Sequence, residues 1–262
     1  TAPAGLEAKK SEKIQGSLAE EQLAFGDRDG FIQKQGPKDW DPASSIQHPV
    51  SRTEPGTQRD QTVLWKEIGF ADLRLVGQIH NTYIVCEAQD RCILIDQHAA
   101  HERILYEKLK QRSQSLKKES QKLLVPETVE FGYREAGILE KLIPEFKDLG
   151  LEIEPFGGNT FVVKAVPALL AGREAKPLIV EIVEKLADTG FAAGLEQSLD
   201  ECHKLMACHG AIRAHQVLSG RQMKELLEQL DTCENPAHCP HGRPTWIEWN
   251  NRELEKLFNR IV

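Results

Sequence analysis

The sequence has no long hydrophobic run. None of its 262 residues lies in an apolar stretch near the roughly 20 residues that a membrane-spanning helix needs. The chain begins with Thr1 rather than Met, and its first residues lack the basic and then apolar pattern of a secretory signal peptide. We therefore expect a cytoplasmic protein without a membrane segment, and a chain that is part of a longer protein.

Cysteine is also scarce, with six residues in the whole chain. This number is too small for a secreted disulfide scaffold of this length. Three of the six lie beside a histidine, as Cys202-His203, Cys208-His209 and Cys239-Pro240-His241. Thiols next to imidazoles in a reduced compartment are candidate metal ligands, so the cysteine usage favours metal binding over disulfides.

An excess of basic residues is absent as well. Lys and Arg number 33 against 40 Asp and Glu, which gives a formal net charge of −7. Contacts to phosphates require a basic surface, so this balance argues against a protein that binds nucleic acid unaided. If DNA is a partner, something else must hold it near the chain.

The hydrophobic pattern divides the chain into a linker and a folded part. Residues 1–66 combine Pro, Gly, Ser and Gln with both charge signs and show no regular period, which predicts a disordered linker with at most a short helix over 17–24. The remainder predicts an α+β fold. Strands are expected over 73–78, 82–87, 91–95, 151–155, 160–166 and 245–249, and helices over 97–113, 136–149, 177–186, 199–218, 221–230 and 252–262.

Polar groups gather where the strand over 91–95 gives way to the following helix. Asp96 stands at the junction, and His98 and Glu102 are four residues apart, so they share one helix face, with His101 about 60° away. Glu107 points elsewhere. These groups make half of a divalent-cation site, although a His-x-x-x-Glu pair alone is more often a solvated ion pair.

A later loop supplies the other half. Cys239 and His241 are separated by one residue and lie between prolines, and Gly242 lets the chain turn, so both side chains can reach one ion. Arg243 could anchor a phosphate or a carboxylate of the site. Cys208, on the helix over 199–218, is either a further ligand or a buried structural thiol.

Gln121-Lys122-Leu123-Leu124-Val125-Pro126 combines a glutamine, a bulky apolar pair and a proline that stops a helix. From these residues alone, an edge strand is favoured.

Taken together, these motifs resemble MutL-type DNA mismatch-repair proteins. Asp96-Gln97-His98-Ala99-x-x-Glu102-x-x-x-x-Glu107 matches the endonuclease motif of that family at every fixed position. The later motifs follow in the family's order, as Ala207-Cys208-His209, Cys239-Pro240-His241-Gly242-Arg243-Pro244 and Phe258-Asn259-Arg260. The resemblance covers about residues 67–262, the family's C-terminal domain. It also makes Gln121, Leu124 and Pro126 a docking motif for the sliding clamp.

The resemblance implies an α+β fold of two subdomains. A dimerisation subdomain would combine residues 67–118 with 199–262, and residues 119–198 would form an inserted regulatory subdomain. The expected partners are a second copy of the chain, duplex DNA bound weakly, the DNA polymerase sliding clamp, and the mismatch-recognition protein MutS through the full-length protein. No nucleotide site is expected, because the family's ATPase domain lies outside this sequence.

The activity that the resemblance implies is a latent endonuclease that nicks one strand of duplex DNA with Mn2+, with Zn2+ as a structural or regulatory ion. Asp96, His98 and Glu102 would be catalytic. The implied metal ligands are Asp96, His98, Glu102, Cys208, Cys239 and His241. Glu107 and Arg243 would support these ligands or orient a phosphate. The alternative is a non-catalytic dimerisation module whose thiols and imidazoles hold a structural zinc ion.

Overall fold

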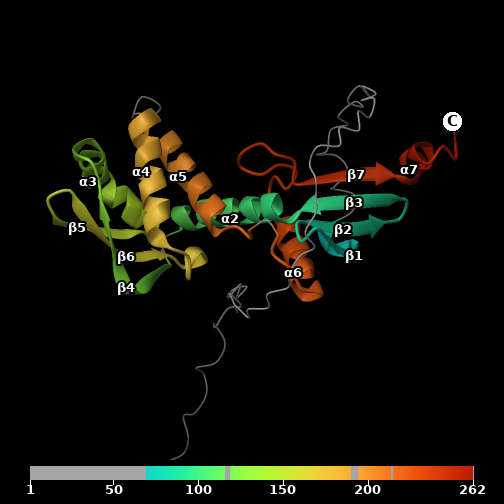
Figure 1. The fold of residues 1–262 in the computed structure, drawn as a ribbon, viewed down its shortest axis with the longest axis horizontal. Helices are drawn as coiled ribbons and strands as arrows, with labels where there is room; N and C mark the ends of the chain where they lie inside the picture. Colours follow the sequence, from blue (N-terminus) through green and yellow to red (C-terminus); the bar gives the residue numbers. More distant parts are fainter. Residues whose placement is uncertain (1–68, 116–118, 190–193, 214, 262) are drawn as a thin grey trace, which may run out of the picture.

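The computed structural model describes residues 69–115, 119–189, 194–213 and 215–261. The expected linker over 1–66, with its short helix, lies outside the described residues. The described elements form two bodies that are joined by a long helix, α2 (Figure 1). Helix and antiparallel sheet occur in both bodies, which confirms the predicted α+β class.

One body is built on a four-stranded antiparallel sheet with the order β1-β2-β3-β7. Its buried face packs on α6, and the short 3-10 helix η1 adds Phe70 to the same core. All four strands were expected from the sequence to within a few residues. The elements of this body are η1 (Phe70–Asp72), β1 (Arg74–Ile79), β2 (Tyr83–Ala88), β3 (Arg91–Asp96), α6 (Gly220–Asp231), β7 (Trp246–Asn250) and α7 (Asn251–Leu257).

The other body contains a three-stranded antiparallel sheet with the order β4-β6-β5, covered by helices. The predicted hairpin across residues 156–159 is confirmed, because β5 pairs with β6. The elements here are β4 (Ser120–Glu130), α3 (Tyr133–Asp148), β5 (Glu152–Gly157), β6 (Thr160–Pro167), the 3-10 helix η2 (Ala168–Leu170), α4 (Ala175–Thr189) and α5 (Leu195–Gly210).

Helix α2 (Gln97–Gln114) belongs to both cores. Ala100 and Ile104 pack with the four-stranded sheet, whereas Leu105 and Leu109 pack with the helices and sheet of the other body. A period of 3.6 residues places these two pairs on different sides of the helix. A functional group on α2 is therefore fixed by packing from both bodies.

Two helices end earlier than the sequence predicts. Helix α5 stops at Gly210 rather than at residue 218, and the chain turns extended at Ala211. A Cβ at Gly210 would lie 2.5 Å from Leu170 Cδ2, so the end of α5 packs closely against η2 in the same body. Helix α7 stops at Leu257 rather than at residue 262, and Asn259 adopts a φ of 53°.

Among the residues described, no helix combines the length and the apolar character needed to cross a membrane.

Candidate metal centre

Asp96 ends β3 and caps α2. Its Oδ1 accepts hydrogen bonds from the backbone N–H groups of His98, at 2.9 Å, and Ala99, at 3.0 Å. Its own N–H donates to the carbonyl oxygen of Thr245, which ties the start of α2 to the beginning of β7. A carboxylate in this position satisfies free N–H groups and the positive end of the helix dipole. The sequence-based placement of Asp96 at a strand-to-helix junction is confirmed.

The loop before β7 forms a tight turn around Cys239 and His241. The N–H of Gly242 donates to the carbonyl of Cys239 at 2.9 Å, and the N–H of Cys239 donates to the carbonyl of Arg243 at 2.8 Å. Gly242 has a φ of 85°, a conformation that residues with a Cβ adopt at a cost. The turn thus presents the thiol and the imidazole in one direction, as the spacing predicted.

Two side chains of α2 hold the base of this loop. Arg103 Nε donates to the carbonyl of His238 at 2.6 Å. The carboxylate of Glu107 accepts from the N–H groups of Glu234, at 2.7 Å, and Asn235, at 3.1 Å. Arg103 and Glu107 are themselves paired at 3.7 Å. Glu107 therefore supports the loop, while Arg103 is a supporting residue that the sequence analysis missed.

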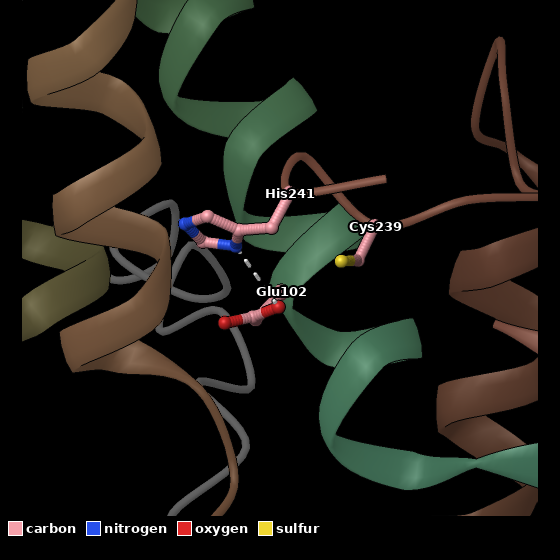
Figure 2. A group of neighbouring side chains, drawn as sticks. All are labelled: Glu102, Cys239 and His241. Atoms are coloured by element: carbon pink, nitrogen blue, oxygen red, sulfur yellow. Dashed lines mark ion pairs between the residues drawn. The ribbon is translucent and has the colours of Figure 1, made fainter. Parts of the chain in front are cut away.

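Glu102, Cys239 and His241 meet between α2 and the loop. Their potential ligand atoms all lie within 4.8 Å of one another. Figure 2 shows the thiol and the imidazole ring reaching toward Glu102 from the loop above the helix. The dashed ion pair joins His241 Nδ1 to Glu102 Oε2 at 3.5 Å.

The Glu102 side chain is fully buried, yet it carries a charge. Burial raises the pKa of Glu102, but the hydrogen-bonding approach of His98 and the nearby His241 and Arg243 outweigh burial and lower this pKa to about 2. Arg243 Nη2 lies 3.0 Å from Oε2, and His98 Nε2 lies 3.3 Å from Oε1. The site is therefore a buried carboxylate compensated entirely by groups that surround it.

These residues fit a divalent cation. Within the part of the chain that the structure describes, Glu102 Oε1 is buried and has no directed hydrogen-bond donor. A thiolate, an imidazole and a carboxylate form a donor set that zinc accepts readily, whereas manganese prefers the oxygen donors. A cation at this point would satisfy Oε1 and draw on all three side chains.

Comparisons with known proteins bear directly on this arrangement. Residues 76–218 match the family described as MutL C terminal dimerisation domain. The chain belongs to the MutL family. It is similar to the DNA mismatch repair protein MutL of Syntrophotalea carbinolica (43% identity over 73% of this chain and 30% of the relative) and of Trichlorobacter lovleyi (42%, 73% and 32%). The MutL protein of an Exiguobacterium strain is 35% identical over 86% of this chain and 37% of its own length.

This MutL-family chain spans about a third of the length of the curated relatives that it matches. The family's description as a dimerisation domain supports homodimer formation. The predicted α+β fold of a MutL C-terminal domain is thereby confirmed.

Of the other three ligands that the MutL motifs predict, His98 and Cys208 interact with Glu102, whereas Asp96 caps the start of α2. His98 contacts Glu102, as described above. Burial, and then the negative charge of Glu102, raise the pKa of the Cys208 thiol to about 11. Neither residue, nor Asp96, belongs to the group within 4.8 Å, and the described residues contain no second group of that kind.

The hexapeptide 121–126 lies in β4, at an edge of the three-stranded sheet. Its pairing with β6 is regular at Gln121 and Lys122 and resumes only at Glu127. Between them Leu124 and Val125 project outward, with exposed fractions of 104% and 77%. The edge strand expected from the residues alone is confirmed, and it leaves the apolar part of the motif open to solvent.

Proposed function

We propose that this chain is the homodimeric C-terminal domain of a metal-dependent endonuclease that nicks one strand of duplex DNA in mismatch repair. The observation that carries the proposal is the buried, ionised Glu102 facing Cys239 and His241. Its relatives are named DNA mismatch repair proteins, which makes DNA the substrate class.

Glu102, Cys239 and His241 would hold the ion. Asp96, His98 and Cys208 are the further proposed ligands, and they would fill the remaining coordination positions. A bound divalent ion would neutralise charge at the phosphorus and lower the pKa of a water molecule from 15.7 toward ~7. Zn2+ suits the thiolate position, and Mn2+ suits the carboxylates.

Besides neutralising Glu102, Arg243 would orient a phosphate group of the DNA. Its side chain is 56% exposed although its Nη2 reaches the buried Glu102. A guanidinium in that position can orient a phosphate group at the mouth of the site while it neutralises the carboxylate below. His98 Nε2 lies 3.3 Å from Glu102 Oε1, and Asp96 caps the same helix; we assign these three residues to catalysis.

The exposed part of β4 is the proposed docking motif for the sliding clamp, through Gln121, Leu124 and Pro126. The net charge of −7 predicts weak binding to DNA by this chain alone. A tether to a clamp on DNA raises the effective DNA concentration to roughly millimolar without any new contact. MutS would act through the full-length protein, and no nucleotide site is proposed here.

The outer face of the four-stranded sheet is the proposed dimer interface. The register places Val85 opposite Leu94, and Leu94 opposite Ile247, on the face away from the core that contains α6. Tyr83 and Ile79 extend the same face and are 36% and 44% exposed. Such an apolar face gains stability when a second copy covers it. Residues 67–118 and 199–262 would form the dimerisation subdomain and residues 119–198 the regulatory one, with α5 of the first packed into the core of the second.

A second candidate function is a dimerisation module with a structural zinc ion. The family's description as a dimerisation domain and the thiol in the cluster favour it. This module would bind zinc and dimerise, but it would not nick DNA.

Nicking of supercoiled plasmid with Mn2+, with and without sliding clamp, separates the two functions. The decisive variant is Asp96→Asn, because an Asn oxygen still accepts from the N–H groups at the start of α2. Asp90→Asn, in the turn before β3, is the matched control. Clamp-stimulated nicking that Asp96→Asn loses and Asp90→Asn keeps supports the endonuclease. A folded, zinc-binding dimer that never nicks supports the structural module.

A further inference from the structure

Two histidines of α2 hold the backbone of one residue in the segment after α5. The N–H of Ile212 donates to Nδ1 of His101 at 2.9 Å, and the carbonyl oxygen of Ile212 lies 2.8 Å from Nδ1 of His98. The Ile212 side chain is fully buried in the core of the four-stranded sheet. The backbone of Ile212 is therefore a fixed point against the start of α2.

The contact with the carbonyl determines which nitrogen of His98 carries a proton. A carbonyl oxygen only accepts hydrogen bonds, so Nδ1 of His98 must be the donor. In the neutral ring, Nε2 then has a free electron pair. Nε2 is the atom that lies 3.3 Å from Glu102 Oε1. Ile212 thus selects the tautomer that presents a metal-binding nitrogen to the candidate metal centre.

The contact with the N–H of Ile212 determines the opposite state at Nδ1 of His101, which carries no proton. A backbone N–H only donates, so Nδ1 of His101 must be the acceptor. The His101 side chain is 6% exposed, so this hydrogen bond lies in the buried interior and is shielded from water.

We propose that His101 is a positioning residue of the metal centre. By accepting the Ile212 N–H it holds the peptide whose carbonyl sets the tautomer and orientation of His98. The inference rests on the proposed function, since it matters only if His98 serves the bound ion. It gives a role in the site to a buried histidine that could otherwise be regarded as part of the core.

The test compares two substitutions of His101 with a matched control. His101→Asn keeps an acceptor near the position of Nδ1, whereas His101→Leu removes it. His203→Leu is the control, because His203 on α5 is also 6% exposed and its Nε2 is buried without a partner among the described residues. The readouts are the 15N shifts of the His98 ring in zinc-free protein, at a pH where the ring is neutral, and the affinity for Zn2+.

We expect wild type, His101→Asn and His203→Leu to keep the proton of His98 on Nδ1. His101→Leu should show a mixture of tautomers and bind Zn2+ roughly tenfold more weakly or worse, the usual range for residues that orient a ligand. The proposal is overturned if His101→Leu matches wild type in both readouts, or if His203→Leu weakens Zn2+ binding equally.

The wild-type spectrum alone also decides the matter if His101→Leu does not fold. A proton on Nε2 of His98 in the neutral wild-type ring would overturn the proposal. A proton on Nδ1 of His98 in both wild type and folded His101→Asn would support it. A failure of the proposed function looks different: wild type would then hold the predicted tautomer but bind no Zn2+.

Discussion

Arg243 Nη2 lies 3.0 Å from Glu102 Oε2, so a side chain of the loop neutralises a carboxylate buried in α2. The two residues are 141 positions apart. The ion pair connects the loop to the helix beside the three candidate ligands.

Replacing Arg243 should therefore lower the free energy of unfolding more in the zinc-free protein than in the zinc-bound protein. Arg243→Ala leaves the Glu102 charge less compensated, and because the arginine is partly exposed we expect a loss of only about 1 kcal/mol. A bound cation would take over the compensation. Urea unfolding with and without Zn2+ measures both losses, and equal losses would contradict this view of the site.

Glu107 should matter for metal affinity although it is not a proposed ligand. Glu107→Ala removes the acceptor of two N–H groups at the base of the loop. We expect Zn2+ affinity to fall about tenfold while the fold is kept, because the loop ligands lose their fixed position. Glu140→Ala, at an exposed site on α3, is the control and should bind Zn2+ like wild type. Unchanged affinity in Glu107→Ala would show that the loop needs no such support.

Clamp binding should depend on the outward part of β4. Gln121→Ala combined with Leu124→Ala should abolish measurable binding to the sliding clamp in surface plasmon resonance. Both side chains are exposed, so the free energy of unfolding should change by less than about 0.5 kcal/mol. Val125→Ala, an exposed residue of the hexapeptide that is not one of the three proposed clamp contacts, serves as the control. Full clamp binding by the double variant would refute the docking assignment.

The dimer should depend on the outer face of the four-stranded sheet. Leu94→Glu places a charge at the centre of the proposed interface, opposite Val85 and Ile247. Light scattering should then report a monomer with native circular dichroism. Phe156→Glu, at an exposed position near the end of β5, should remain a dimer. If Leu94→Glu also dimerises, the interface lies elsewhere.

Local pattern was sufficient to predict much of this arrangement. The bounds of α2 follow from Asp96 as a capping residue and from helical spacing, and they agree with the structure to within one residue. The turn at Cys239 follows from proline and glycine chemistry. In both places the residues that determine the structure are neighbours in the sequence.

The remaining features depend on contacts between distant residues. The end of α5 is set where Gly210 packs against Leu170 and Leu105, and no periodicity reports that contact. Arg103 and His101 act on backbone groups 135 and 111 positions away, so neither could be identified from its surroundings in the sequence. The same reason explains why sequence alone gave six candidate ligands, of which the structure gathers three within 4.8 Å.

Crystallography of the zinc-soaked chain, with anomalous data at the zinc edge, tests the metal centre most directly. We predict an anomalous peak between α2 and the loop, bonded to the Glu102 carboxylate, the Cys239 thiolate and the His241 imidazole, and absent from Glu102→Gln crystals. A peak elsewhere with none at this cluster, or one that Glu102→Gln leaves unchanged, would contradict the account.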